Sequence, residues 1–90
     1  MEISFDPDKR SRTLIERGLD FADAGLVFAG PVVTWRDERA DYGEPRFITL
    51  GVLDGRSVVL VWTPRGEARR IISMRKANER EIAKYSPTLG

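Results

Sequence analysis

Arginine is the residue type in this 90-residue chain with the clearest capacity for chemistry. The chain contains no histidine and no cysteine, which removes the commonest general base near neutral pH, the imidazole and thiolate metal ligands, and the cysteine nucleophile. Any catalysis must therefore depend on arginine, lysine, tyrosine, hydroxyl or carboxylate side chains. The sequence also has no glycine-rich phosphate loop, metal-ligand spacing or Ser-His-Asp set, so we expect neither a metal nor a cofactor.

Two arginines are predicted to converge on one face of the sheet. Asp54-Gly55 is typical of a type I′ hairpin turn, and it lies between two runs rich in β-branched residues. A turn there pairs Arg46 with Thr63, and a four-residue second loop pairs Arg70 with Val61. This register would place the two arginines on one face of the sheet, at neighbouring positions along the strands.

Neighbouring guanidinium groups repel each other unless an anion or a carboxylate lies between them, and a phosphate is the natural occupant. The alternative is a surface network in which Glu44, Glu67 or Glu81 neutralises both arginines. Alternation along the strand predicts that Arg75 shares a face with Ile71 and Ser73 or lies in the turn to the last helix. Arg75 has two interpretations as well, because it either binds phosphate or holds the C-terminal helix through Glu79.

Three aromatic side chains have both a functional and a structural interpretation. Tyr85 either donates a proton or stacks on a base, or it packs against the sheet together with Ile82. Trp35 and Trp62 either stack on bases or belong to the core. The surroundings of both tryptophans favour the core.

The elements that must position these side chains follow from caps, turns and periodicity. Asp6-Pro7 predicts the start of a helix that Gly18 ends, and Asp20 predicts the start of a second helix. Asn78, with Glu81 three residues later, has capping-box spacing. The predicted order is strand Ile3–Phe5, helix Pro7–Arg17, a helix to Gly30, strand Val32–Trp35, strands Arg46–Val52 and Ser57–Thr63, strand Ala68–Met74, and a helix to about Tyr85.

This order predicts an α+β fold of two layers, with a largely antiparallel sheet, an N-terminal helix pair and a C-terminal helix. The run Val58–Trp62 is apolar at every position, so it should be the central strand. The length predicts one domain over residues 1–90.

The net charge is only +1, but basic residues gather between Arg65 and Lys84, which indicates an anion-facing surface or an ordinary solvated one. No run is apolar enough for a signal peptide or a membrane span, so we expect a cytoplasmic protein without membrane contact.

Five segments and two further positions resemble the BrnT toxin family. The segments are FDPDK at Phe5–Lys9, GLDFADA at Gly18–Ala24, VFAGP at Val27–Pro31, PRFITLG at Pro45–Gly51 and RIISMRKA at Arg70–Ala77. Glu81 and Tyr85 also match in position. The resemblance spans nearly the whole chain.

The resemblance implies a RelE-like fold and endoribonuclease activity on RNA. It also implies neutralisation by a BrnA-type antitoxin with a ribbon-helix-helix DNA-binding part, so that operator DNA is contacted only through the antitoxin. The modest core of a 90-residue chain separately predicts association, as a homodimer or a dimer of heterodimers. The catalytic residues it suggests are Arg46, Arg70, Arg75, Glu81 and Tyr85. The further RNA-binding residues we predict are Lys9, Arg17, Arg69 and Lys76.

The chain departs from the family pattern at two places. Glu16-Arg17-Gly18 stands where the family commonly has Lys-His-Gly, and Thr13 stands where it commonly has Asn. A metal-free ribonuclease would use the 2′-hydroxyl of the RNA as its nucleophile, with Glu81 or Glu44 as base and Lys9 or Tyr85 as acid. Because the usual histidine is replaced, a non-catalytic module that binds RNA or the antitoxin is the alternative, and a structural subunit of a repressor complex is a third.

Overall fold

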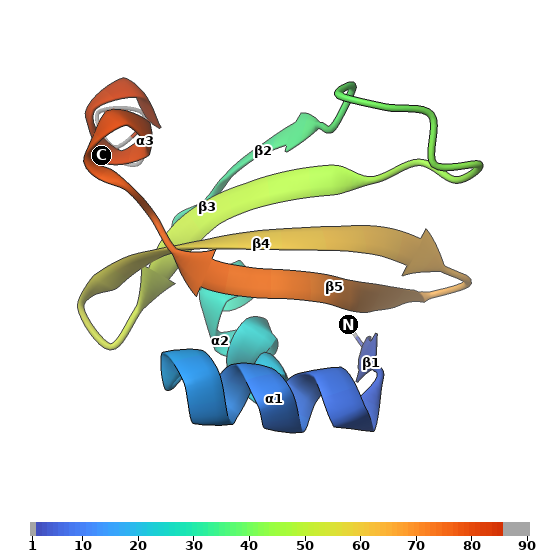
Figure 1. The fold of residues 1–90 in the computed structure, drawn as a ribbon. Helices are drawn as coiled ribbons and strands as arrows, with labels where there is room; N and C mark the ends of the chain where they lie inside the picture. The colour runs from blue at the N-terminus through green and yellow to red at the C-terminus, as the bar shows by residue number, and fades with distance from the viewer. Residues whose placement is uncertain (1, 86–90) are drawn as a thin grey trace.

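The structure, a computed structural model, describes residues 2–85 as a five-stranded sheet with helices on both sides. The first part of the chain forms β1 (Glu2–Phe5), α1 (Pro7–Arg17), the 3₁₀ turn η1 (Phe21–Asp23), α2 (Ala24–Ala29) and β2 (Val33–Arg36). The second part forms β3 (Phe47–Leu53), β4 (Arg56–Arg65), β5 (Ala68–Lys76) and α3 (Glu79–Tyr85). Figure 1 shows α1 and α2 below the sheet and α3 above it.

The strand order is β1-β5-β4-β3-β2, and every neighbouring pair is antiparallel except β1 with β5. The predicted α+β class and the largely antiparallel sheet are therefore confirmed. β4 is the central strand, as its continuous apolar run predicted, because side chains pack against both of its faces. Among residues 2–85, no helix has both the length and the apolar character that crossing a membrane requires.

The first hairpin has the predicted turn and register. Asp54 and Gly55 both have positive φ angles, 52° and 76°, as a type I′ turn requires. Leu50 pairs with Val59, and Ile48 pairs with Val61. The dipeptide therefore fixes which side chains of β3 and β4 share a face.

The second hairpin was predicted with the wrong register. β4 continues to Arg65, so the turn is only Gly66-Glu67, with Gly66 at a φ of 58°. Arg70 therefore pairs with Thr63 and not with Val61. The glycine accounts for the shorter loop, since it adopts the left-handed conformation of a tight turn without strain.

A β-bulge adds a second correction in this hairpin. Val61 pairs with Ser73 while Trp62 pairs with Ile71, so one extra residue is inserted into β5 at Ile72. Arg75 consequently shares a face with Ser73 but not with Ile71, because the bulge reverses the alternation. Simple parity counting along β5 cannot anticipate this reversal.

The helix boundaries follow the predicted caps. The Asp6 carboxylate accepts a hydrogen bond from the backbone N–H of Asp8, and Gly18 ends α1 with a φ of 68°. Asp20 caps the next segment by accepting from Ala22, as predicted. The structure divides that segment into η1 and the six-residue α2, where the sequence predicted one continuous helix.

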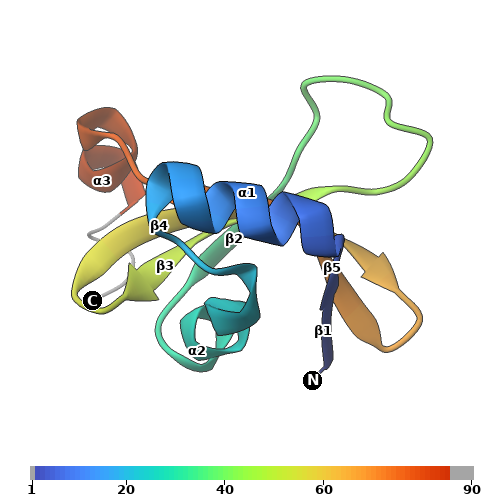
Figure 2. The ribbon, with the colours of Figure 1, turned by 60° about the horizontal axis from the view of Figure 1, so that its bottom comes forward.

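The main core lies between the sheet and the segment that contains η1 and α2 (Figure 2), whereas α1 contributes no fully buried side chain. Its buried residues are Leu19, Phe21, Ala24, Val27, Leu53, Val58, Leu60, Trp62, Ile71 and Met74. α2 reaches the sheet at Gly51, where a Cβ atom would lie 2.5 Å from Val27 Cγ1 and 3.1 Å from Val32 Cγ1. A glycine is therefore needed at this position for the close approach of helix and strand.

Candidate active site on the open face of the sheet

The face of the sheet opposite α1 and α2, which we call the open face, carries most of the predicted catalytic residues. α3 and the loop of residues 37–46 rise on this side of the sheet in Figure 1. A small apolar cluster of Ile48, Leu50 and Val59 forms the centre of this face, with Trp35, Val61, Ala77 and Tyr85 packed against it. Polar and charged side chains surround that cluster.

Arg46 and Arg70 lie on the open face, separated by one strand. Arg46 immediately precedes Phe47, which pairs with Trp62, so Arg46 lies beside Thr63. Arg70 pairs with Thr63 from the other side. Arg46 and Arg70 therefore lie on either side of the buried Thr63, which donates a hydrogen bond of 2.6 Å to the carbonyl of Pro45.

Arg46 is held in place by the loop of residues 37–46. Its guanidinium carbon lies 4.1 Å from the centre of the Tyr42 ring, and its Nε lies 3.5 Å from a carboxylate oxygen of Glu44. That Nε is buried and has no hydrogen-bond partner among the described residues. A buried guanidinium N–H without a partner is costly, and an incoming anion would satisfy it.

Arg75 is bound to the C-terminal helix. Its Nη1 and Nη2 each donate a hydrogen bond of 2.7 Å to Glu81, which also accepts from the backbone of Asn78. Asn78 in turn accepts from the backbone N–H of Glu81, which confirms the capping box. The sequence suggested Glu79 as the partner of Arg75, and the structure corrects this to Glu81, whose side chain turns back toward the start of α3.

This ion pair changes the acidity of both groups. The hydrogen bonds to Glu81 raise the pKa of Arg75, and the same bonds lower the pKa of Glu81. A carboxylate with a lowered pKa is a weak proton acceptor. Glu81 is therefore better suited to orient Arg75 than to act as a general base.

Tyr85 packs on the open face instead of pointing freely into solvent. Its ring stacks on Trp35 with 4.2 Å between ring centres and an interplanar angle of 15°. Trp62 lies on the other face, where it is 8% exposed and donates from Nε1 to Thr49 Oγ1. The prediction of core packing thus holds for Trp62, while Trp35 and Tyr85 form a half-buried stack beside the arginines.

A cavity of about 360 Å³ joins Arg75, Glu81 and Tyr85. Its floor is the sheet, at Ile48, Val59, Val61 and Ser73. Among the described residues, its rim contains four basic side chains, Arg39, Arg75, Arg80 and Lys84, but only one carboxylate, Glu81. The cavity is therefore suited to an anion with an apolar or aromatic part.

The open face has two arginine-bearing ends. Arg46 and Arg70 align with Thr63, whereas Arg75 pairs with Val59, four residues away along β4. This offset corresponds to about 13 Å along the strand. Glu44 belongs to the first end and Tyr85 to the second. The two ends are consequently too far apart to act on one phosphate together.

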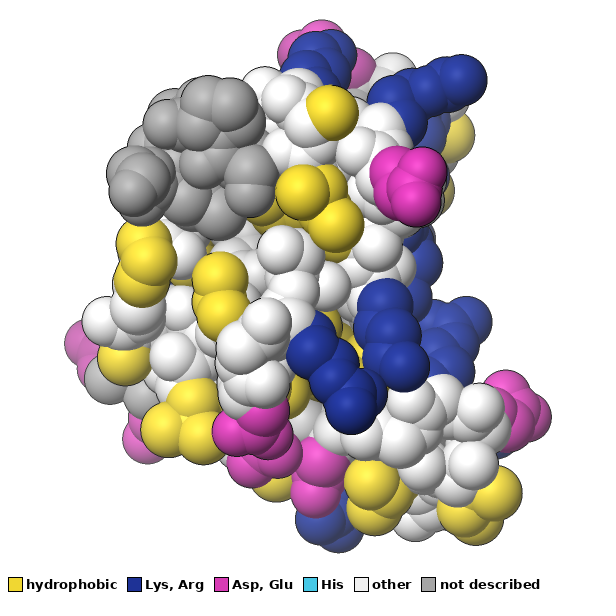
Figure 3. Space-filling view, turned by 90° about the vertical axis from the view of Figure 1, so that its left-hand side faces the viewer, with side chains coloured by type: hydrophobic (Ala, Val, Ile, Leu, Met, Phe, Trp, Pro, Cys, Tyr) yellow, Lys and Arg dark blue, Asp and Glu magenta, His cyan; other side chains and the backbone are white. Residues whose placement is uncertain are grey.

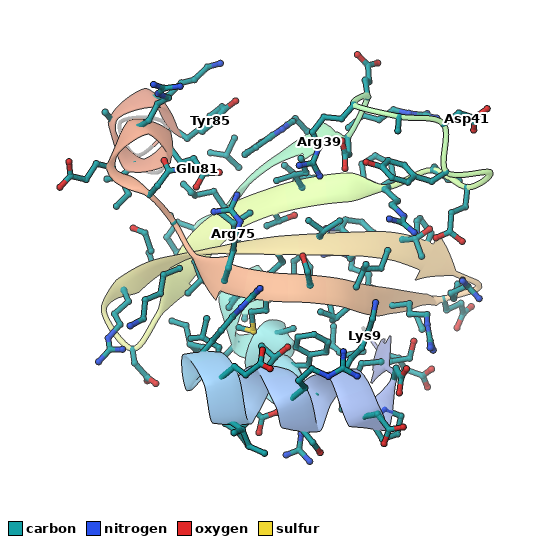
Figure 4. The ribbon with its side chains drawn as sticks, in the orientation of Figure 1. Lys9, Arg39, Asp41, Arg75, Glu81 and Tyr85 are labelled. Atoms are coloured by element: carbon teal, nitrogen blue, oxygen red, sulfur yellow. The ribbon has the colours of Figure 1, made fainter. Side chains whose placement is uncertain are left out.

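The predicted RNA-binding residues lie elsewhere. Lys9 and Arg17 belong to α1, on the other side of the sheet from Arg75 (Figure 4), and Arg17 donates to the carbonyl of Met74. Arg69 lies over the rings of Phe28 and Trp62 on the helix side. Lys76 is exposed at the end of β5. In Figure 3, several basic side chains gather on the surface between α3, at the top, and α1, at the bottom.

The sequence pattern does not indicate two residues of this site, Asp37 and Arg39. Arg39 lines the cavity, and Asp37 binds Arg39 through both carboxylate oxygens. They lie in a polar stretch that was assigned only as a loop. No sequence signal separates the buried carboxylate from exposed ones in the charged run Arg36-Asp37-Glu38-Arg39. Among residues 2–85, no group of three or more acidic side chains is arranged to hold a metal ion.

The comparison with protein families decides what kind of protein this is. A model described as "Ribonuclease toxin, BrnT, of type II toxin-antitoxin system" matches residues 5–81. The chain belongs to the BrnT family. A comparison with curated protein sequences found no match to the chain. Membership makes the chain a ribonuclease toxin of a type II toxin–antitoxin system, which implies an antitoxin partner. The BrnT match includes Arg46, Arg70, Arg75 and Glu81 but ends before Tyr85.

Proposed function

We propose that the open face is the RNA-cleaving surface and that cleavage occurs without a metal ion, at the Arg75 end. The observation that carries this proposal is the cavity itself, which gathers Arg75, Glu81 and Tyr85 under a rim of basic side chains. An RNA strand supplies a phosphate for the rim and a base for the aromatic and apolar floor. A single RNA strand therefore provides both the anion that the basic rim binds and the flat apolar group that the floor accommodates.

In the proposed reaction, the 2′-hydroxyl of the RNA attacks the adjacent phosphorus and gives up its proton to a solvent water, and the 5′-oxygen departs in line with the attack. The P–O bond to the 5′-oxygen breaks as the new bond forms, which leaves a 2′,3′-cyclic phosphate. Arg75 stabilises the charge that gathers on the phosphoryl oxygens, and preorganised donors of this kind typically contribute a factor of about 10²–10³ each. Glu81 holds Arg75 at the correct angle through two hydrogen bonds.

Tyr85 is the proton donor that we propose for the departing 5′-oxygen, since it lines the same cavity as Arg75. Lys9, the other acid considered, is on the opposite side of the sheet (Figure 4). Arg46 and Arg70 bind the strand further along the same face, where the buried Nε of Arg46 lacks a partner among residues 2–85. These two arginines position the RNA strand and take no part in the bond-breaking step.

The partner that we propose is a BrnA-type antitoxin with a ribbon-helix-helix part, through which the complex contacts operator DNA. Co-purification with the product of the adjacent reading frame tests this partner. Isolation of a free monomer when both reading frames are expressed would contradict it.

Cleavage is tested by incubating the purified protein with RNA in the presence of a chelator and mapping the cut ends. We expect 2′,3′-cyclic phosphate ends from the wild type and a loss of about 10²-fold or more in rate for Arg75→Ala. Arg56→Ala is the matched control, because it removes one arginine from the helix side of the sheet, where the neighbours are Asp20, Asp23 and Asp54. Intact RNA with the wild type would overturn the proposal in favour of a non-catalytic binding module.

A further inference from the structure

The loop of residues 37–46 contains a carboxylate that is buried without belonging to the proposed chemistry. Asp37 is 4% exposed and is the only charged residue among residues 2–85 that is fully buried. Burying a carboxylate is costly unless hydrogen bonds compensate for the lost water. A buried charge in an otherwise polar loop therefore indicates that a specific geometry is being maintained.

The hydrogen bonds of Asp37 order the loop around Arg39. Its carboxylate accepts from the backbone N–H of Arg39 at 3.1 Å, from Nε at 2.8 Å and from Nη2 at 2.7 Å. Its own backbone N–H donates to the carbonyl of Arg46 at 2.8 Å, which closes the base of the loop. These bonds to Arg39 hold the pKa of Asp37 at about 2, so the carboxylate is ionised at neutral pH.

Arg39 is held from one side and open on the other. Asp37 engages Nε and Nη2 but not Nη1, and the Arg39 side chain is 67% exposed. Figure 4 shows Arg39 and Arg75 on the same side of the sheet as α3 and Tyr85. Arg39 thus presents a fixed, partly unused guanidinium to the cavity from the side opposite α3.

Arg39 and Arg75 are close enough to affect each other electrically. The hydrogen bonds to Glu81 raise the pKa of Arg75, while the positive charge of Arg39 opposes that rise. Each of the two arginines already has one carboxylate behind it, Asp37 or Glu81. Among the described residues that line the cavity, only Glu81 is acidic, and it is already bound to Arg75, so the two fixed cations can still accept a further anion.

We propose that Arg39 binds a second phosphate of the RNA strand, next to the one held by Arg75, and that Asp37 is the positioning residue that aims it. The ligand is a phosphodiester of single-stranded RNA, so the inference rests on the proposed function for the identity of its ligand. Arg39 lies in a loop between β2 and β3, whereas Arg75 lies on β5. The strand would therefore cross the open face from one side of the cavity to the other.

The test measures binding of an RNA oligonucleotide whose 2′-hydroxyls are replaced by 2′-O-methyl groups, which removes the nucleophile and prevents cleavage. Fluorescence anisotropy at several salt concentrations gives the slope of log affinity against log salt. For a single strand, each lost phosphate contact lowers the magnitude of that slope by about 0.7. We expect this change and a roughly tenfold weaker affinity for Arg39→Ala, while Arg39→Lys keeps most of the slope because it keeps the charge.

Two pairs of variants separate positioning from folding. Asp37→Asn should reproduce the slope change of Arg39→Ala, and adding Asp37→Asn to Arg39→Ala should weaken binding no further. Asp41→Asn is the matched control, because Asp41 is an exposed carboxylate of the same loop that points away from Arg39 (Figure 4). Arg56→Ala controls for the loss of one positive charge. Thermal melts confirm that each variant is folded at the measuring temperature.

The outcomes distinguish this inference from the proposed function. If the wild type leaves natural RNA intact but binds the 2′-O-methyl strand with a slope that depends on Arg39, the cleavage proposal fails and the phosphate contact stands. If the wild type cleaves RNA while Arg39→Ala changes neither slope nor affinity, the inference is overturned. An effect of Asp41→Asn as large as that of Asp37→Asn would also overturn the positioning role.

Discussion

The two faces of the sheet differ in what their side chains contact. On the face toward α1 and α2, apolar side chains contact one another, and the buried residues include Phe21, Leu60 and Met74. On the open face, a much smaller apolar cluster is bordered by arginines, and Arg39 and Arg75 are each fixed by one carboxylate. The first face accounts for most of the stability, while the second holds charged groups in place for a ligand.

The largest expected difference between the faces concerns two neighbouring residues of β4. Leu60 is completely buried against the helices, whereas Val61 is half-buried on the open face. We expect Leu60→Ala to lower the free energy of unfolding by about 2–5 kcal/mol. Val61→Ala should lower the free energy of unfolding by about 1 kcal/mol, because folding removes less apolar surface from water at this half-buried position. Urea denaturation of both variants measures this, and equal losses would contradict the division between the faces.

The next effect concerns the contact between α2 and β3. Gly51→Ala places a Cβ atom against the side chains of Val27 and Val32, and overpacking of this kind costs about 1–3 kcal/mol. Gly25→Ala is the control, since the nearest side-chain atom to its new Cβ is 4.0 Å away and the residue is in α2. That change should be neutral or slightly stabilising. Calorimetric melting of both variants tests this, and a Gly51→Ala protein as stable as the wild type would show that the helix is free to shift.

A smaller effect is expected from acid. Hydrogen bonds from Arg10 and Arg39 lower the pKa of Asp20 and Asp37, respectively, to about 2. A carboxylate whose pKa is lowered in the folded state stabilises the protein at any pH above its ordinary pKa, which is near 4. This contribution is lost as the pH falls from about 4 to 2. Stability should therefore decline over that window. In Asp20→Asn and Asp37→Asn, the decline should be shallower, and an unchanged pH profile would contradict the assignment.

The parts of the fold that the sequence predicts are those set by short-range chemistry. Asp6 and Gly18 bound α1, Asp54-Gly55 sets the register of β3 with β4, and Asn78 begins α3, because each signal acts within a few residues. The pairing of β1 with β5 and the division of the second helix depend on tertiary packing. Local patterns do not contain that information.

The candidate site is only partly predictable for the same reason. The alternation along β3 correctly places Arg46 on the open face, but the register error in the second hairpin and the bulge at Ile72 displace Arg70 and Arg75 from their expected positions. The partner of Arg75 is Glu81, because the capping box turns that side chain back toward β5. Asp37 and Arg39 were missed because burial of a loop carboxylate is decided by the fold and not by its neighbours in sequence.

The most direct test of the central claim is to map where RNA binds. Titration of ¹⁵N-labelled protein with the 2′-O-methyl RNA oligonucleotide, followed by NMR, should shift the amide signals of Val61, Ser73 and residues 79–85 on the open face. Signals from α1 and α2 should move little. Shifts concentrated on α1, around Lys9 and Arg17, with the open face unchanged, would contradict the account.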